Sequence, residues 1–254
     1  MPFVTIASHR VEYVRIPPDR PGRPPLVFLH EGLGSVTMWR DFPERVARAT
    51  GCGAVVYSRY GYGRSDPIAE PRPVCYMHDE ALVALPELLD ALGIEHPILV
   101  GHSDGGSIAL IHAGSTPRPL GGLVLLAPHV LVEDLSVASI AAAREAYEKG
   151  DLRPKLARYH ADVDSAFRGW NDIWLHPDFR AWNIEEVLPR IACPVLAIQG
   201  KLDAYGTMDQ VARIARAVKD TEVLEIEGCG HSPHRDRPEA VLEAIVRFVE
   251  RVAG

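Results

Sequence analysis

The alternation of short apolar runs with amphipathic helical stretches is the feature that most constrains the fold of this chain. Eight runs have the length and composition of β-strands, and several are apolar throughout, as in strands buried on both faces. They are FVTIA (3–7), VEYVRI (11–16), PLVFLH (25–30), AVVYSR (54–59), PILVGH (97–102), GLVLLAP (122–128), PVLAIQG (194–200) and EVLEIEG (222–228). We therefore predict an α/β fold, a mostly parallel eight-stranded sheet with helices on both faces.

Two parts of the chain depart from this alternation. The first two runs are separated by too few residues for a crossover helix, so we expect them to pair antiparallel at one edge of the sheet. Between His129 and Ile191 there is no strand signal, and three stretches have helical patterns. A segment of that length is too long for a loop. We predict a helical insertion at 129–190, after the sixth strand, in a core domain made of 1–128 and 191–254.

Composition excludes several classes of protein. The chain has 254 residues, 47% of them hydrophobic, and a formal net charge of −7, which leaves no basic surface for nucleic acid. No apolar run is long enough to span a membrane, and the first residues lack a signal-peptide pattern, so we expect a cytoplasmic protein with no membrane partner. The four cysteines form no Cys-x-x-Cys pair, which argues against a zinc site and a disulfide framework. The sequence does not indicate an oligomeric state.

The strongest functional signal is the segment LVGHSDGGSIAL at 99–110. It contains a Gly-x-Ser-x-Gly pattern centred on Ser103, where a predicted strand meets a predicted helix, as a nucleophile elbow requires. Side chains two residues on either side of the serine would clash in so sharp a turn, which accounts for Gly101 and Gly105. A serine before a helix is otherwise an ordinary N-cap. We take Ser103 as the candidate nucleophile, with the backbone N–H groups of the helix start facing the developing oxyanion.

Over nearly its whole length the chain resembles an α/β-hydrolase. The segment LHEGLGSVTMW at 29–39 resembles the family's oxyanion loop after the third strand, and SRYGYGRSD at 58–66 resembles its Arg-Gly-x-Gly-x-Ser turn after the fourth. The helical insertion stands where members of the family carry a cap over the active site. The resemblance implies a catalytic triad in the chain order serine, acid, histidine.

The resemblance also implies the other two members of the triad. A serine nucleophile needs a histidine base, and the imidazole needs a carboxylate that fixes its tautomer. The segment GCGHSPHRDRPEA points to His231 as the base, and we expect its rival His234 at the pocket rim or surface. The two histidines lack the glutamate of a zinc motif. The segment IQGKLDAYGTMDQ points to Asp203 as the acid, whereas the alternative, Asp209, falls in the first turn of the next predicted helix.

The oxyanion hole is expected between the elbow and the loop after the third strand. One donor is the backbone N–H of Asp104, and the second is that of Gly32 or Leu33. Glu31 replaces the glycine of the family pattern, and its carboxylate lies either at the pocket mouth or on the surface. The Asp104 side chain also has two interpretations. It complements the helix dipole, or it reaches the pocket and, with Glu31, selects a cationic substrate.

The insertion holds a cluster of aromatic residues in the stretch FRGWNDIWLHPDFRAW at 167–182. Aromatic residues at helical spacing usually build the core of a cap, but a cap over the nucleophile also supplies the apolar walls of the pocket. We take Trp170, Trp174 and His176 as candidate substrate contacts.

These residues together predict a serine hydrolase that cleaves a small carboxylic ester or related acyl compound without a cofactor or a metal. Ser103 attacks the carbonyl carbon while His231 takes its proton, and water then hydrolyses the acyl-enzyme. Because the elbow residue is serine and not aspartate, alkyl-enzyme chemistry is disfavoured. Two alternatives stay open: hydrolysis of a carbon–carbon bond in a diketone-type substrate by the same triad, and a small-molecule receptor with little turnover.

Overall fold

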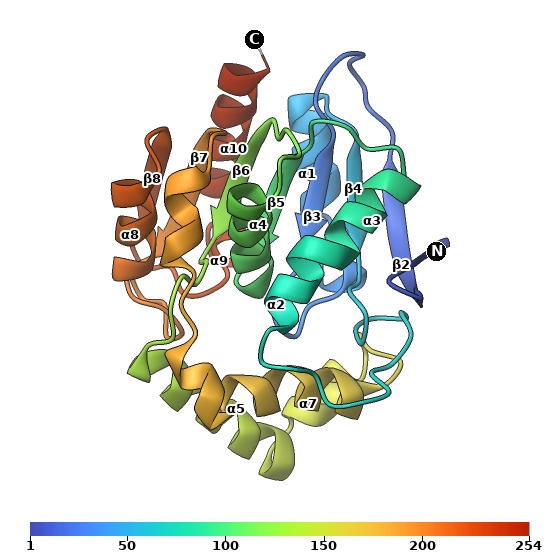
Figure 1. Cartoon of the computed structure of the whole chain (residues 1–254), viewed down its shortest axis with the longest axis vertical. Helices are drawn as coiled ribbons and strands as arrows, with labels where there is room; N and C mark the ends of the chain where they lie inside the picture. Colours follow the sequence, from blue (N-terminus) through green and yellow to red (C-terminus); the bar gives the residue numbers. More distant parts are fainter. Residues whose placement is uncertain (254) are drawn as a thin grey trace.

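The computed structural model describes residues 1–253, and its strands form one sheet with helices on both faces (Figure 1). The strands are β1 (Phe3–Ile6), β2 (His9–Ile16), β3 (Leu26–Leu29), β4 (Ala54–Tyr57), β5 (Ile98–His102), β6 (Gly122–Leu126), β7 (Val195–Gly200) and β8 (Thr221–Ile226). The predicted fold class and the eight predicted strands are confirmed. None of the helices within 1–253 is long and apolar enough to cross a membrane.

The strands follow the order β1-β2-β4-β3-β5-β6-β7-β8. β1 and β2 pair antiparallel at one edge, as expected, and β2 also pairs antiparallel with β4. From β4 to β8 all neighbouring strands are parallel. Parallel pairing brings the carboxyl ends of these strands to the same edge of the sheet, so the loops that follow them gather there.

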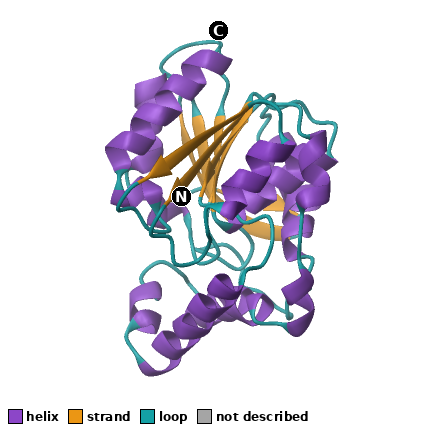
Figure 2. Cartoon of the chain, turned by 90° about the vertical axis from the view of Figure 1, so that its left-hand side faces the viewer, coloured by secondary structure: helices purple, strands orange, loops and turns teal. Residues whose placement is uncertain are grey.

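Two helical layers cover the sheet, which Figure 2 shows nearly edge-on. On one face lie α1 (Phe42–Thr50) and α10 (Pro238–Val252), with the short η1 (Val36–Trp39) and α9 (Pro233–Asp236) near them. On the other face lie α2 (Tyr76–Asp79), η2 (Glu80–Ala84), α3 (Leu85–Ala91), α4 (Asp104–Ser115) and α8 (Asp209–Ala217). Along β3, Phe28 packs into the first layer, whereas Val27 and Leu29 pack into the second. This alternation is the two-residue period of a strand buried on both faces.

The segment between β6 and β7 is helical and lies across the carboxyl ends of the strands, at the bottom of Figure 1. It contains α5 (Asp134–Lys149), α6 (Leu152–Leu156), α7 (Val163–Trp174), η3 (Pro177–Ala181) and η4 (Glu185–Arg190). A bridge between Leu131 and Asn183 joins the two ends of this segment. The last element, η4, packs instead on α4 and α8 beside the sheet. The division into a core domain and a cap at 129–190 stays a prediction.

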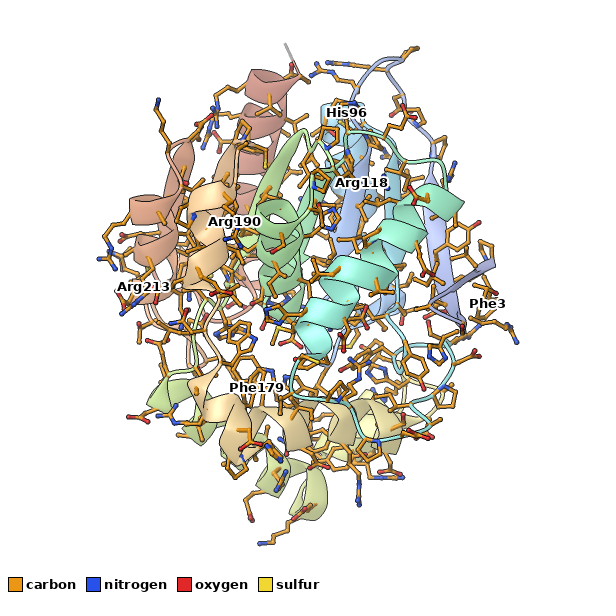
Figure 3. The ribbon with its side chains drawn as sticks, in the orientation of Figure 1. Phe3, His96, Arg118, Phe179, Arg190 and Arg213 are labelled. Carbon is orange, nitrogen blue, oxygen red and sulfur yellow. The ribbon has the colours of Figure 1, made fainter. Side chains whose placement is uncertain are left out.

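Aromatic side chains fill the junction between this segment and the sheet. Phe179 is 1% exposed, and Figure 3 shows it where the helices between β6 and β7 meet the rest of the molecule. Its ring stacks on Trp182 and lies edge-on to Trp174, with ring centroids 5.5 and 5.1 Å apart. Tyr76 of α2 lies on the other side, 6.3 Å from Phe179. Part of the aromatic cluster therefore builds structural packing, not a pocket wall.

Candidate active site

Ser103 occupies a strained turn between β5 and α4. Its backbone has φ 52° and ψ −117°, a conformation that side-chain-bearing residues rarely adopt. A Cβ atom on Gly101 would lie 2.3 Å from the carbonyl oxygen of Gly105, and one on Gly105 would lie 2.1 Å from that of Leu29. Only glycine fits at both positions, because the elbow presses its own backbone together and against β3.

The structure brings Ser103, His231 and Asp203 together. The Ser103 Oγ atom lies 3.0 Å from His231 Nε2. On the other side of the ring, His231 Nδ1 lies 2.9 and 2.8 Å from the two carboxylate oxygens of Asp203. These distances give a continuous chain of hydrogen bonds from hydroxyl to imidazole to carboxylate, the arrangement in which a serine can pass its proton to a neutral histidine.

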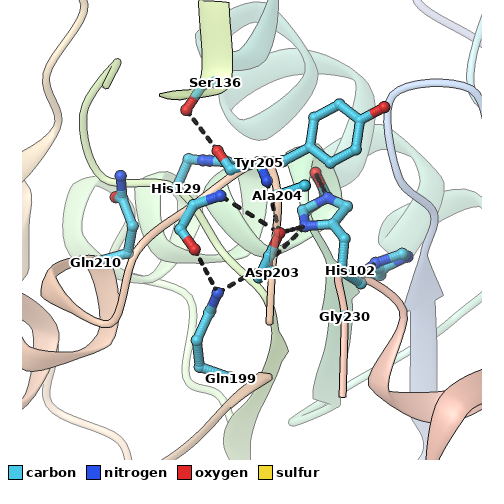
Figure 4. Close-up of polar contacts among 12 residues, drawn as sticks. His102, His129, Ser136, Gln199, Asp203, Ala204, Tyr205, Gln210 and Gly230 are labelled. Atoms are coloured by element: carbon cyan, nitrogen blue, oxygen red, sulfur yellow. Dashed lines mark hydrogen bonds and ion pairs between the residues drawn. The ribbon is translucent and has the colours of Figure 1, made fainter. Parts of the chain in front are cut away.

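Asp203 is held by β7 and by the loop after it, as Figure 4 shows. The backbone N–H of Tyr205 donates to its Oδ1 atom at 2.7 Å, and Gln199 Nε2 donates to its Oδ2 atom at 2.7 Å. Burial alone would raise the pKa of this carboxyl, but the hydrogen bond and charge of His231 and the N–H of Tyr205 outweigh burial, so the pKa lies below its usual value. Asp203 is therefore ionised and ready to stabilise an imidazolium.

The alternative acid, Asp209, and the alternative base, His234, do not lie beside Ser103. Asp209, in α8, binds the side chain of Arg213 at 2.6 Å. His234 was expected at the pocket rim or surface, and this expectation is wrong. It is 4% exposed and packs against both Trp39 and Phe42, with ring centroids 4.9 and 5.5 Å away. The short α9 turns this side chain inward behind the elbow, into the layer formed by α1 and α10.

The loop after β3 is fixed around the carbonyl oxygen of Glu31. This oxygen accepts hydrogen bonds from Arg59 Nη2 at 2.9 Å and from the backbone N–H of Gly34 at 3.0 Å. His30 Nδ1 lies 2.6 Å from it, and His30 Nε2 accepts the backbone N–H of Arg59 at 3.0 Å, which assigns the proton of this histidine to Nδ1. The N–H groups that follow in the loop are thereby oriented by a rigid support.

Gly32 and Leu33, the two candidates for the second oxyanion donor, both line the cavity beside Ser103. Within residues 1–253, neither the Gly32 N–H nor the Leu33 N–H donates a hydrogen bond to another backbone group. A Cβ atom on Gly32 would lie 2.2 Å from the indole of Trp170, so glycine is required where the loop passes under α7. Both N–H groups stay candidates.

Glu31 lines the cavity, and its side chain is only 16% exposed, which argues against the interpretation as a surface residue. Its Oε2 atom is 3.3 Å from His102 Nδ1, and its Oε1 atom is 3.8 Å from Arg235 Nη2. Burial would raise the pKa of this carboxyl, but the nearby His102 and Arg235 side chains hold it well below the usual range. Glu31 thus places a negative charge next to the candidate triad. This charge is already paired with groups of the protein.

The side chain of Asp104 is fully buried and does not line the cavity. Its Oδ2 atom accepts a hydrogen bond from the Tyr76 hydroxyl at 2.6 Å, and its Oδ1 atom accepts one from Trp174 Nε1 at 3.2 Å. Arg59 Nη2 lies 3.8 Å from Oδ2 and supplies the opposite charge. Of the two interpretations of this side chain, the one in which Asp104 meets a substrate cation is therefore wrong, because three side chains of the protein already surround the carboxylate.

The cavity at Ser103 has a volume of about 130 Å³. It is lined by Glu31, Gly32, Leu33, Ser103, His129, Ile140, Trp170, Trp174, Tyr205 and His231. The two tryptophans of α7 are therefore wall residues, as expected. His176 is not: its side chain is 47% exposed and accepts the backbone N–H of Asp178 at 3.2 Å, so this expectation is corrected.

Three lining residues were not singled out from the sequence: His129, Ile140 and Tyr205. His129 follows β6 and Tyr205 follows β7, at the carboxyl ends of parallel strands, where ligand sites of α/β folds gather. That position was the available signal for both. Ile140 projects from α5, and no local pattern distinguishes it from other apolar residues of that helix. Among residues 1–253 no cluster of three or more potential ligands could hold a metal ion.

The comparisons with known proteins agree with this geometry. Residues 26–244 match the sequence profile described as the Alpha/beta hydrolase family. The chain belongs to this family. It is 28% identical over 255 residues to a Caulobacter sp. (strain K31) protein that bears the name carbamate hydrolase RutD, and the alignment covers 90% of this chain and 91% of that protein.

Further relatives show how varied the α/β-hydrolase family is. The chain is 23% identical to the 2-hydroxy-6-oxo-6-phenylhexa-2,4-dienoate hydrolase of Comamonas testosteroni, over 89% of this chain and 87% of that protein. A thermophilic esterase from Thermogutta terrifontis has the same fold, with a TM-score of 0.79, 18% identity and coverage of 99% of this chain and 98% of the other. Family membership alone therefore does not select a substrate.

Proposed function

We propose that this α/β-hydrolase cleaves small carboxylic esters through an acyl-enzyme on Ser103. The observation that carries the proposal is the hydrogen-bonded chain from Ser103 Oγ through His231 to Asp203, at the wall of a cavity. In this mechanism His231 takes the serine proton as Ser103 attacks the carbonyl carbon, and then returns it to the leaving alcohol. Water, activated by the same histidine, releases the acid.

The oxyanion is held by the N–H of Asp104 and by that of Gly32 or Leu33. Preorganised donors of this kind supply much of the rate enhancement in acyl transfer, because they need no reorganisation when charge develops. The three hydrogen bonds around the Glu31 carbonyl support one wall of this site, and the strained elbow supports the other.

The cavity volume favours a small ester over a large one. At about 130 Å³ it is well below the roughly 300–1,000 Å³ of pockets for drug-sized ligands. Small carbamates fit the same volume and share the same acyl chemistry, so they belong in the test.

A panel of p-nitrophenyl acetate, butyrate and octanoate with a small carbamate, run with fluorophosphonate labelling, tests the proposal. We expect many turnovers on the short esters, little on octanoate, and a label on Ser103. Ser103→Ala should lower kcat/KM by about 10⁴-fold or more and abolish the label, since the triad acts as a unit. Activity that survives Ser103→Ala would refute the assignment, and binding with at most one turnover would favour the receptor alternative.

A further inference from the structure

His129 is a buried titratable residue at the active site that the proposed mechanism does not use. It follows β6, is 2% exposed and lines the cavity with Ser103 and His231. Its backbone is fixed by α4: Ser107 Oγ donates to the His129 carbonyl oxygen at 2.6 Å and lies 3.2 Å from the His129 N–H. The imidazole is thus held in place by its own backbone and by the rings around it.

The ring packs among the groups that would surround a bound substrate. Its centroid lies 5.0 Å from the ring of Trp174, in an edge-on arrangement, and 5.7 Å from the ring of His231. Other walls of the same cavity are apolar, among them Leu33 and Ile140. A polar ring in this position is costly to bury unless it finds a hydrogen-bond partner.

The imidazole is neutral. Burial, and to a lesser extent the neighbouring His231, lowers the pKa of His129 to about 3. A neutral imidazole has one N–H donor and one acceptor nitrogen. Nδ1 is buried beside Gly206 and has no hydrogen-bond partner among residues 1–253.

The buried, unpaired Nδ1 atom indicates the tautomer of His129. An unpaired N–H group is rarer in protein interiors than an acceptor with a free lone pair, so we assign the lone pair to Nδ1 and the proton to Nε2. Nε2 is then the ring nitrogen that can contact a substrate in the cavity. It would do so as a hydrogen-bond donor.

We infer that His129 recognises a second acceptor atom of the substrate, close to the scissile carbonyl. This inference rests on the proposed ester hydrolysis and narrows it: the preferred substrates are small esters that carry an ether, keto or hydroxyl oxygen within a few bonds of the reacting carbon. The small volume of the cavity sets that spacing, since His129 and Ser103 line the same 130 Å³. A site built to pair a polar group discriminates against the analogue that lacks it, because the buried donor is then left unpaired.

The test compares p-nitrophenyl methoxyacetate with p-nitrophenyl butyrate, which differ only by an oxygen in place of a methylene group. The ratio of kcat/KM for the two esters is measured against the ratio of their rates with hydroxide, which removes their difference in intrinsic reactivity. We expect the enzymatic ratio to exceed the hydroxide ratio by about 5- to 10-fold, as one net hydrogen bond allows. Because both kcat/KM values are measured on the same preparation, their ratio does not depend on the fraction of the enzyme that is active.

Variants assign the effect to the imidazole. His129→Phe keeps a ring against Trp174 but has no N–H, so its ratio should fall to the hydroxide value, whereas His129→Gln keeps an N–H donor and should retain part of the excess. Ile140→Val, on the same cavity, changes an apolar wall without removing a hydrogen-bond donor, so its ratio should still exceed the hydroxide value.

The outcomes separate this inference from the proposed function. A wild-type ratio equal to the hydroxide ratio would overturn the inference even if no variant could be purified, and so would an excess that persists in His129→Phe. Absence of turnover on both esters would overturn the proposed function, and the inference with it.

Discussion

At the scale of single residues, neighbours decide what a side chain does. Asp104 and Glu31 are both carboxylates next to the candidate oxyanion hole. The first is buried against Tyr76, Trp174 and Arg59, and the second lies at the cavity with His102 and Arg235 beside it. In both cases the negative charge is compensated by the protein, which removes the electrostatic argument for a cationic substrate.

The two histidines of the segment after β8 give a prediction at the same scale. His231→Gln should lower kcat/KM by several orders of magnitude, because glutamine cannot take the Ser103 proton. His234→Gln should change kcat/KM of the folded enzyme less than tenfold and instead lower stability, since it buries an amide against the rings of Trp39 and Phe42. Steady-state kinetics with active-site titration, which counts active enzyme, checks both variants. A larger kinetic loss in His234→Gln than in His231→Gln would contradict the assignment of the base.

At the scale of helices and strands, one hydrogen-bonded cluster ties three elements together. Tyr76 begins α2, Asp104 begins α4, and Trp174 ends α7. Trp174 Nε1 lies 3.2 Å from both the Tyr76 hydroxyl and the Asp104 carboxylate, so α7 is joined directly to the elbow. Burial and the charge of Asp104 raise the pKa of Tyr76 well above its usual value, which keeps the hydroxyl a donor.

Removing one hydroxyl tests this junction. Tyr76→Phe should lower the free energy of unfolding by about 1.5–3 kcal/mol, the contribution typical of a hydrogen bond to a charged group. Tyr62→Phe is the matched control, because Tyr62 is equally buried but its hydroxyl has no partner among residues 1–253, and we expect a change within about 0.5 kcal/mol. Urea unfolding of the three proteins gives both numbers. Equal losses in the two variants would show that the Tyr76–Asp104 contact does not stabilise the fold.

At the scale of the whole molecule, buried neutral histidines couple stability to pH. Burial, the largest cause in each case, lowers the pKa of His30, His129 and His234 below the usual value of about 6.5. Between that value and the lower folded-state pKa, the unfolded chain binds more protons than the folded one. Stability therefore rises with pH through this window and is lost as pH falls below about 6.5.

This coupling predicts a measurable loss on mild acidification. Together with His112 and His160, whose pKa burial also lowers, the three histidines should lower the free energy of unfolding by on the order of 1 kcal/mol per histidine between about pH 7.5 and 5.5. Urea unfolding at the two pH values measures the total loss of unfolding free energy. His129→Phe should reduce that loss by the contribution of one histidine. A free energy of unfolding that does not fall over this interval would contradict the burial of these rings in the neutral form.

What the sequence determined by itself is local or periodic. Eight apolar runs with helices between them define the sheet, because strand burial on two faces leaves a continuous apolar signature. The elbow around Ser103 is equally local, since Gly101 and Gly105 are needed wherever the chain turns that sharply. Asp203 and His231 could be proposed because the family resemblance places them on segments that follow particular strands.

Only the tertiary structure decided the contacts between distant segments. His234 turned inward, His176 outward, and Asp104 found partners 28 and 70 residues away in the chain, none of which a local pattern encodes. The same holds for His129, whose place in the cavity depends on how α5 and α7 close over the strand ends. Periodicity reports which residues are buried within an element, whereas the identity of their neighbours is fixed by packing between elements.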